Sequence, residues 1–246
     1  MRNIKLTIEY DGKDFNGWQK QPNKLNIQGS IEQAIYQITG EEVELNASGR
    51  TDAGVHALGQ VANFKTNSNI PIEKFAIAIN TKLKKSIRIL KAEEVDERFH
   101  SRLSCKRKTY RYIINNSEQG TAIYRNLETN ISYHLDETKM NEASKYFIGE
   151  HDFKAFKASG TSSKSSVRKI YDAKVYRQGD RIFIEITGNG FLYNMVRIIS
   201  GTLVEVGMGK MQPEEIKEII QSKNREKAGK TLPPQGLYLV EVEYEK

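Results

Sequence analysis

Apolar side chains occupy every second position between Ile4 and Tyr10. A period of two predicts a strand with one buried face. Farther along, Ile27, Ile31 and Ile35 recur every four residues, and Gly40 follows them. This spacing predicts an amphipathic helix that ends at a glycine in the left-handed conformation.

The same two periodicities predict the other elements of the chain. The expected strands are residues 43–46, 60–65, 87–89, 109–114, 181–187 and 237–244. The expected helices are residues 71–83, 136–147 and 191–206. Because the strands are spaced like hairpins, the pattern predicts an α+β protein with antiparallel sheets and helices packed on one side. Since the second half resembles the first, we expect two halves, residues 1–104 and 105–246, around a central cleft.

The charge balance favours a polyanionic partner. The chain has 38 basic and 31 acidic residues, a formal net charge of +7. Five basic residues lie in one acid-free stretch between Arg102 and Arg111, interleaved with Tyr110 and Tyr112. The net charge alone suits nucleic acid or an acidic membrane surface. Because basic groups neutralise phosphates and aromatic rings stack on bases, this stretch favours nucleic acid.

The cysteine content and the beginning of the chain indicate the compartment. Cys105 is the single cysteine, which excludes an intramolecular disulfide and a thiolate metal cluster within one chain. Residues 1–6 lead directly into the first strand pattern without the apolar core of a signal peptide, and no stretch is apolar enough to span a bilayer. We therefore expect a cytoplasmic protein.

The segment richest in candidate chemistry is residues 49–57, GRTDAGVHA. Its glycines and alanines allow a large substrate to approach the backbone, and the guanidinium of Arg50 lies two positions from the carboxylate of Asp52. Such a pair suits covalent or electrostatic chemistry on a sugar or a base. The alternative is a structural turn in which Asp52 caps a backbone amide.

Two further segments carry candidate residues. Residues 10–19 combine a tight turn with the single tryptophan, Trp18, which alternatively only fills the core. Residues 188–197 lead into an apolar helix carrying Arg197, a cation that is costly to bury unless it reaches solvent or a carboxylate. The Ser- and Thr-rich residues 159–166 predict a loop, either simply solvated or acting as a basic lid on RNA.

Motifs for cofactors are missing from the sequence. The four histidines show no HExxH spacing, and neither a phosphate-binding loop of the Walker type nor a GxGxxG element occurs. We therefore expect no metal, no nucleotide and no redox cofactor.

Seven short motifs together resemble the tRNA pseudouridine synthase A family. They follow the order found in that family, extend over nearly the whole chain, and the one containing Asp52 is the most specific. The motifs are YDG to WQ (10–19), GRTDAGVHA (49–57), FHSR (99–102), KTYRY (108–112), GEHDF (149–153), GFLYNMVR (190–197) and GLYL (236–239).

The resemblance implies a role for five residues. Asp52 matches the catalytic aspartate, Arg50 the arginine that holds the target base out of its stack, and Tyr110 the aromatic residue packed on that base. Arg197 matches the cation paired with the aspartate, and Leu237 a hydrophobic contact in the pocket. The resemblance further implies two ferredoxin-like (RRM-like) halves, a homodimer, and uridines 38, 39 and 40 of the tRNA anticodon arm as targets. Neither DNA nor a membrane is expected as a partner.

Two other classes of protein stay open from the residues alone. The basic, tyrosine-rich strand also suits a non-catalytic RNA-binding protein, which would leave RNA chemically unchanged. A carboxylate enzyme such as a nucleoside glycosidase would release free uracil, whereas isomerisation retains the base in the chain.

Overall fold

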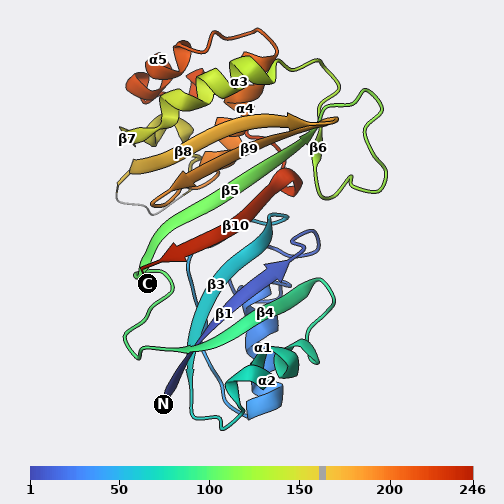
Figure 1. Cartoon of the computed structure of the whole chain (residues 1–246), viewed down its shortest axis with the longest axis vertical. Coiled ribbons are helices and arrows are strands. Elements are labelled where there is room, and N and C mark those ends of the chain that lie inside the picture. Colours follow the sequence, from blue (N-terminus) through green and yellow to red (C-terminus); the bar gives the residue numbers. More distant parts are fainter. Residues whose placement is uncertain (161–164, 246) are drawn as a thin grey trace. The chain divides into compact units, whose positions relative to one another are not determined.

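The computed structural model describes residues 1–160 and 165–245, and the chain forms two compact units. Unit 1 consists of Met1–Lys106 and Tyr238–Lys246, and unit 2 of Arg107–Leu237. Each unit has mixed α+β structure with mostly antiparallel strands (Figure 1). The predicted α+β class is therefore confirmed.

The sheet of unit 1 has the strand order β4-β1-β3-β10, and β2 also pairs with β3. β1 is antiparallel to both of its neighbours, and β10 is parallel to β3. The elements of this unit are β1 (Arg2–Tyr10), α1 (Ile27–Thr39), β2 (Asn46–Ala47), β3 (His56–Thr66), α2 (Ile72–Asn80), β4 (Ile87–Val95) and β10 (Leu237–Tyr244).

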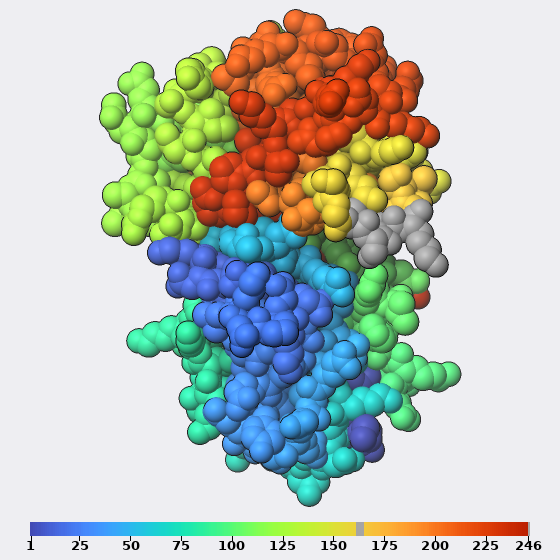
Figure 2. All heavy atoms as spheres, turned by 180° about the vertical axis from the view of Figure 1, so that it is seen from behind, coloured from blue at the N-terminus to red at the C-terminus, as the bar shows by residue number. Residues whose placement is uncertain are grey.

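The periodicities explain these elements of unit 1. Ile4, Leu6 and Ile8 of β1 are fully buried, as their alternation predicts. The Asn26 side chain caps α1 by accepting from the Gly29 amide at 2.8 Å, and Gly40 ends the helix with a φ of 73°. The first helix and its glycine stop are therefore confirmed, and Figure 2 shows α1 in blue on the surface of the unit.

Unit 2 has the strand order β5-β9-β8-β7, antiparallel throughout, and β6 pairs parallel to β5. Helix α3 packs against α4 and β8. The strands are β5 (Cys105–Asn115), β6 (Thr129–Asn130), β7 (Gly149–Asp152), β8 (Val167–Gln178) and β9 (Arg181–Gly188). The helices are α3 (Glu137–Ser144), α4 (Met195–Gly207) and α5 (Glu215–Ser222), with 3-10 turns at Lys145–Phe147, Phe153–Phe156, Arg225–Lys227 and Pro234–Gly236.

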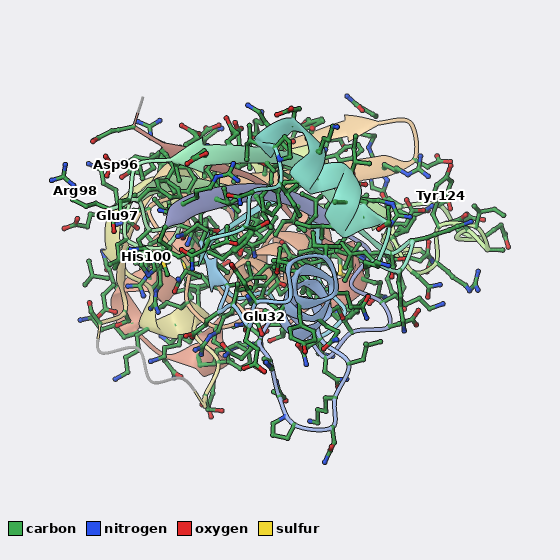
Figure 3. The ribbon with its side chains drawn as sticks, turned by 90° about the horizontal axis from the view of Figure 1, so that it is seen from below. Glu32, Asp96, Glu97, Arg98, His100 and Tyr124 are labelled. Carbon is green, nitrogen blue, oxygen red and sulfur yellow. The ribbon has the colours of Figure 1, made fainter. Side chains whose placement is uncertain are left out.

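Two predicted elements are wrong in their extent. Of the strand expected at residues 43–46, only Asn46 lies in a strand, because the Glu32 carboxylate accepts the Leu45 amide at 3.1 Å and takes the place of a ladder partner. Glu32 is labelled on α1 in Figure 3. The helix expected at 191–206 begins only at Met195, since Asn194 has a left-handed φ of 58°. The loop expected at 159–166 lies partly outside the described residues. No described helix combines the length and apolar character needed to span a bilayer.

Candidate active site

Asp52 lies on the loop that joins β2 to β3 in unit 1. Its carbonyl accepts the amide of Val55 at 3.1 Å, which closes a tight turn over Ala53 and Gly54. Gly54 has a φ of 77°, a conformation that favours glycine. The turn leaves Asp52 partly exposed beside the exposed Arg50, while Thr51 between them is buried. The loop therefore presents the carboxylate and the guanidinium and anchors the residue between them.

The segment that follows β1 fixes this loop. The hydroxyl groups of Tyr10 and Thr51 are hydrogen-bonded at 2.7 Å, and the Trp18 amide donates to the Thr51 carbonyl at 3.0 Å. At Gly12, a Cβ atom would lie 2.0 Å from the Val55 carbonyl oxygen, so only glycine permits this approach. The structure thus brings together two segments that the sequence presented as separate candidates. Trp18 is also buried, as its core-filling interpretation predicts.

Burial of Tyr10 affects its acidity. Desolvation raises the pKa of the Tyr10 phenol well above its usual range, and hydrogen bonds with Thr51 and Gln60 offset only part of that effect. The phenol is therefore neutral at physiological pH, and it serves the loop as a hydrogen-bonding group without carrying charge.

Gln60 is a supporting residue that the sequence analysis missed. Its Oε1 accepts from the Ser48 hydroxyl at 2.7 Å, and its Nε2 donates to the Gly49 carbonyl at 2.9 Å. Gln60 is fully buried on β3. An amide side chain among the apolar residues of a strand was the available signal, because a buried polar group needs partners.

His56, the first residue of β3, contributes to the structure through contacts with two other segments. Its Nδ1 accepts from the Gly12 amide at 3.1 Å, and its ring stacks on Tyr238 with centroids 4.8 Å apart. These contacts join the C-terminal end of the Asp52 loop to Gly12 and to β10. Among the described residues, no three His, Cys, Asp or Glu side chains form a group able to hold a metal.

Tyr110, Arg197 and Leu237 belong to unit 2. Tyr110 lies on β5, is 8% exposed, and meets the ring of Phe191 edge-on at 5.0 Å. Arg197 lies in the first turn of α4, where Nε donates to the Leu232 carbonyl at 2.7 Å and Nη1 to Asn194 Oδ1 at 2.8 Å. Arg197 thereby fixes the segment that leads to Leu237, which is buried at the start of β10.

The residues of the basic and aromatic stretch from Arg102 to Tyr112 lie in different environments, some in the core and some in ion pairs. Tyr112 is fully buried, and its hydroxyl donates to the Pro233 carbonyl and is also hydrogen-bonded to Thr129. Tyr112 is therefore a core residue, since β5 turns its ring inward. Lys106 is paired with Glu245 and Arg111 with Glu185, each at 2.7 Å.

These features define a mixed α+β protein in which neighbouring segments hold a glycine-containing loop that carries an aspartate. The family model described as tRNA pseudouridine synthase matches residues 6–103 and 143–245. The chain belongs to the tRNA pseudouridine synthase family.

Three relatives illustrate the similarity. The chain is 56% identical to the tRNA pseudouridine synthase A of Caldicellulosiruptor saccharolyticus, covering 99% of this chain and all of the relative. It is 54% identical to the tRNA pseudouridine synthase A 2 of Clostridium perfringens and 53% identical to the tRNA pseudouridine synthase A of Acetivibrio thermocellus, with the same coverage.

Proposed function

We propose that this protein isomerises uridine to pseudouridine in tRNA and that Asp52 is its catalytic carboxylate. The observation that carries the proposal is the Asp52 loop, presented by Gly54 and held by Tyr10, Trp18 and Gln60, in a chain that matches tRNA pseudouridine synthases over its full length. A structural turn does not require support from so many separate segments. The support suits a carboxylate that must be held in one position for reaction.

The reaction breaks the bond between N1 of uracil and C1′ of ribose and rejoins the base through C5. Electrons balance without an oxidant or a group donor, and the hydrogen on C5 leaves as a proton. The Asp52 carboxylate has three routes: attack at C1′, attack at C6, or removal of a proton from C2′. All three need the ionised form of Asp52. The partly exposed position of this residue avoids the full cost of burying a charge.

The other site residues have proposed roles in binding. Turning a uridine out of its stack costs a few kcal/mol, which hydrogen bonds from Arg50 and stacking on Tyr110 would offset. Arg197 is proposed as the cation that favours ionised Asp52, and Leu237 as an apolar contact of the base.

Finer features are proposed from the family resemblance. The targets are uridines 38, 39 and 40 of the anticodon arm, the protein is a cytoplasmic homodimer, and the fold consists of two ferredoxin-like halves. Light scattering measures the oligomeric state, and mapping of pseudouridine in tRNA identifies the targets.

Tritium release from tRNA labelled at C5 of uridine tests the chemistry. Wild-type protein is expected to release tritium while retaining the base, and Asp52→Asn to release none with tRNA affinity and folding preserved. Asp14→Asn, at an exposed aspartate of the supporting segment, is the matched control and keeps wild-type turnover. Free uracil would instead identify a glycosidase, and binding without tritium release a non-catalytic RNA-binding protein. Turnover of Asp52→Asn within tenfold of wild type overturns the catalytic assignment.

A further inference from the structure

Strand β8 carries the pattern Lys-x-Tyr twice, at Lys169 to Tyr171 and at Lys174 to Tyr176. In both copies the lysine Nζ lies over the ring of its tyrosine, 5.7 Å from the centroid in the first and 5.8 Å in the second. The two copies thus share the same internal geometry. Their surroundings differ.

A β-bulge places both copies on one face of the sheet. The copies are five residues apart, an odd spacing that puts them on opposite faces of a regular strand. The pairing of β8 with β9 shifts between Ile170 and Asp172, which leaves Tyr171 as an extra residue. Buried positions accordingly change from Ile170 to Ala173 and Val175. Both lysines therefore lie on the face opposite these buried side chains.

The second copy is part of an ion cluster in which a carboxylate pairs with the lysine. The Nζ of Lys174 lies 2.9 Å from Glu185, which also binds Arg111 at 2.7 Å. The hydroxyl of Tyr176 donates to the same carboxylate at 2.9 Å. This cluster links β5, β9 and β8 and accounts for the second copy as a structural feature.

In the first copy, a second cation lies at the ring of the tyrosine. The guanidinium of Arg107 on β5 lies 4.6 Å from the centre of the Tyr171 ring. Lys169 is exposed, and within residues 1–160 and 165–245 no carboxylate pairs with its Nζ. A ring attracts cations without cancelling their charge, so Lys169 keeps its positive charge beside Tyr171 and contributes a positive field there.

We propose that Arg107, Lys169 and Tyr171 form a binding site for the phosphodiester backbone of RNA. The inference rests on the proposed function and extends it to residues that contact neither the base nor its ribose. Basic side chains bind the phosphates of nucleic acids, and the Tyr171 ring holds Arg107 and Lys169 close to one another by contacting both. These residues therefore contribute to RNA affinity and leave the chemical step unchanged.

The test compares Lys169→Gln with its matched control Lys174→Gln. The dissociation constant of a tRNA transcript is measured from low to high salt, together with the single-turnover rate at saturating tRNA and the stability of each variant to urea. Lys169→Gln and Arg107→Gln are each expected to weaken binding and to lower the slope of log affinity against log salt by about 0.7–0.9. Their double variant lowers the slope about twice as much. Lys174→Gln keeps the wild-type slope.

The remaining outcomes separate this site from the function on which it rests. An unchanged slope in the folded double variant overturns the site, as does an equal loss of slope in Lys174→Gln, which reports net charge alone. Tyr171→Phe is expected to keep the wild-type affinity and Tyr171→Leu to lose part of it. If the wild-type protein binds tRNA with the predicted salt dependence and makes no pseudouridine, the proposed function fails and the phosphate site stands.

Discussion

The hydroxyl of Tyr10 is hydrogen-bonded to the hydroxyl of Thr51 at 2.7 Å, and Thr51 immediately precedes Asp52 in the chain. Tyr10 ends β1, so this bond connects the sheet of unit 1 to the loop that carries the carboxylate. Both side chains are buried. The connection makes Tyr10 a positioning residue for Asp52, acting through Thr51 and without contact to substrate.

Tyr10→Phe tests this connection. The substitution removes the hydroxyl and leaves that of Thr51 buried without this partner, at a cost on the order of 1–3 kcal/mol in the free energy of unfolding. We expect kcat to fall about tenfold through misplacement of Asp52 while KM for tRNA stays close to wild type. Urea unfolding and steady-state kinetics measure the two effects. Thr51→Val completes a double-mutant cycle, and additive effects in that cycle would contradict the coupling.

Gly12→Ala tests the close approach of the supporting segment to the loop. A Cβ atom at this position would lie 2.0 Å from the Val55 carbonyl oxygen, so one of the two backbones must move. We expect a loss of about 2 kcal/mol or more in stability and a reduced kcat. Gly190→Ala is the control, because its added Cβ comes no closer than 3.7 Å to its neighbours. Equal stability of the two variants would refute the steric argument.

Local patterns of sequence were sufficient for much of this fold. Alternation identified β1 correctly, and Gly40 gave the end of α1, because both depend on neighbours close in sequence. The wrong strand prediction at residues 43–45 has a different origin. Leu45 donates to Glu32, and the pattern of residues 43–46 contains no sign of a carboxylate thirteen positions earlier.

The same limit applies to the candidate site. The glycines of residues 49–57 and their resemblance to a family marked Asp52, but the residues that brace its loop come from β1 and β3. The supporting role of Gln60 was not predicted, because its partners Ser48 and Gly49 become its neighbours only when β3 forms. The burial of Tyr112 was not predictable for a related reason, since strand alternation assigns Tyr110 and Tyr112 to the same face and does not reveal how deeply each is buried.

Glu185 gives a prediction about acid stability. Burial alone would raise the pKa of its carboxyl, but hydrogen bonds from Lys174, Tyr176 and Arg111 outweigh burial and hold the pKa below its usual range. A carboxyl with a depressed folded pKa stabilises the protein above its unfolded pKa, and the contribution disappears as the pH falls through the folded pKa. We expect Glu185→Gln to lower stability at neutral pH, and the difference from wild type to disappear only when the pH falls below the depressed pKa of Glu185 in the folded protein.

Urea unfolding at a series of pH values measures this dependence. Glu118→Gln, at an exposed carboxylate, serves as the control and is expected to follow the wild-type curve throughout. A stability difference for Glu185→Gln that persists unchanged into acid would show that its effect comes from packing rather than from charge.

Tyr110 allows its structural and binding roles to be separated. The ring is only 8% exposed and packs edge-on against Phe191 at 5.0 Å, so Tyr110→Ala is expected to lose about 3–5 kcal/mol of stability whatever the ring does in binding. Tyr110→Phe keeps the ring, and Tyr110→Leu keeps much of the apolar volume without an aromatic face. We expect Tyr110→Phe to retain most of the single-turnover rate. If the ring stacks on the uracil, a contact of about 1–3 kcal/mol is lost in Tyr110→Leu, and its rate falls about 5- to 150-fold.

Tyr112→Leu, two residues along the same face, is the matched control: it loses stability, and its folded fraction reacts at the wild-type rate. A folded Tyr110→Leu variant with the wild-type rate would end the stacking role and leave Tyr110 a core residue of β5.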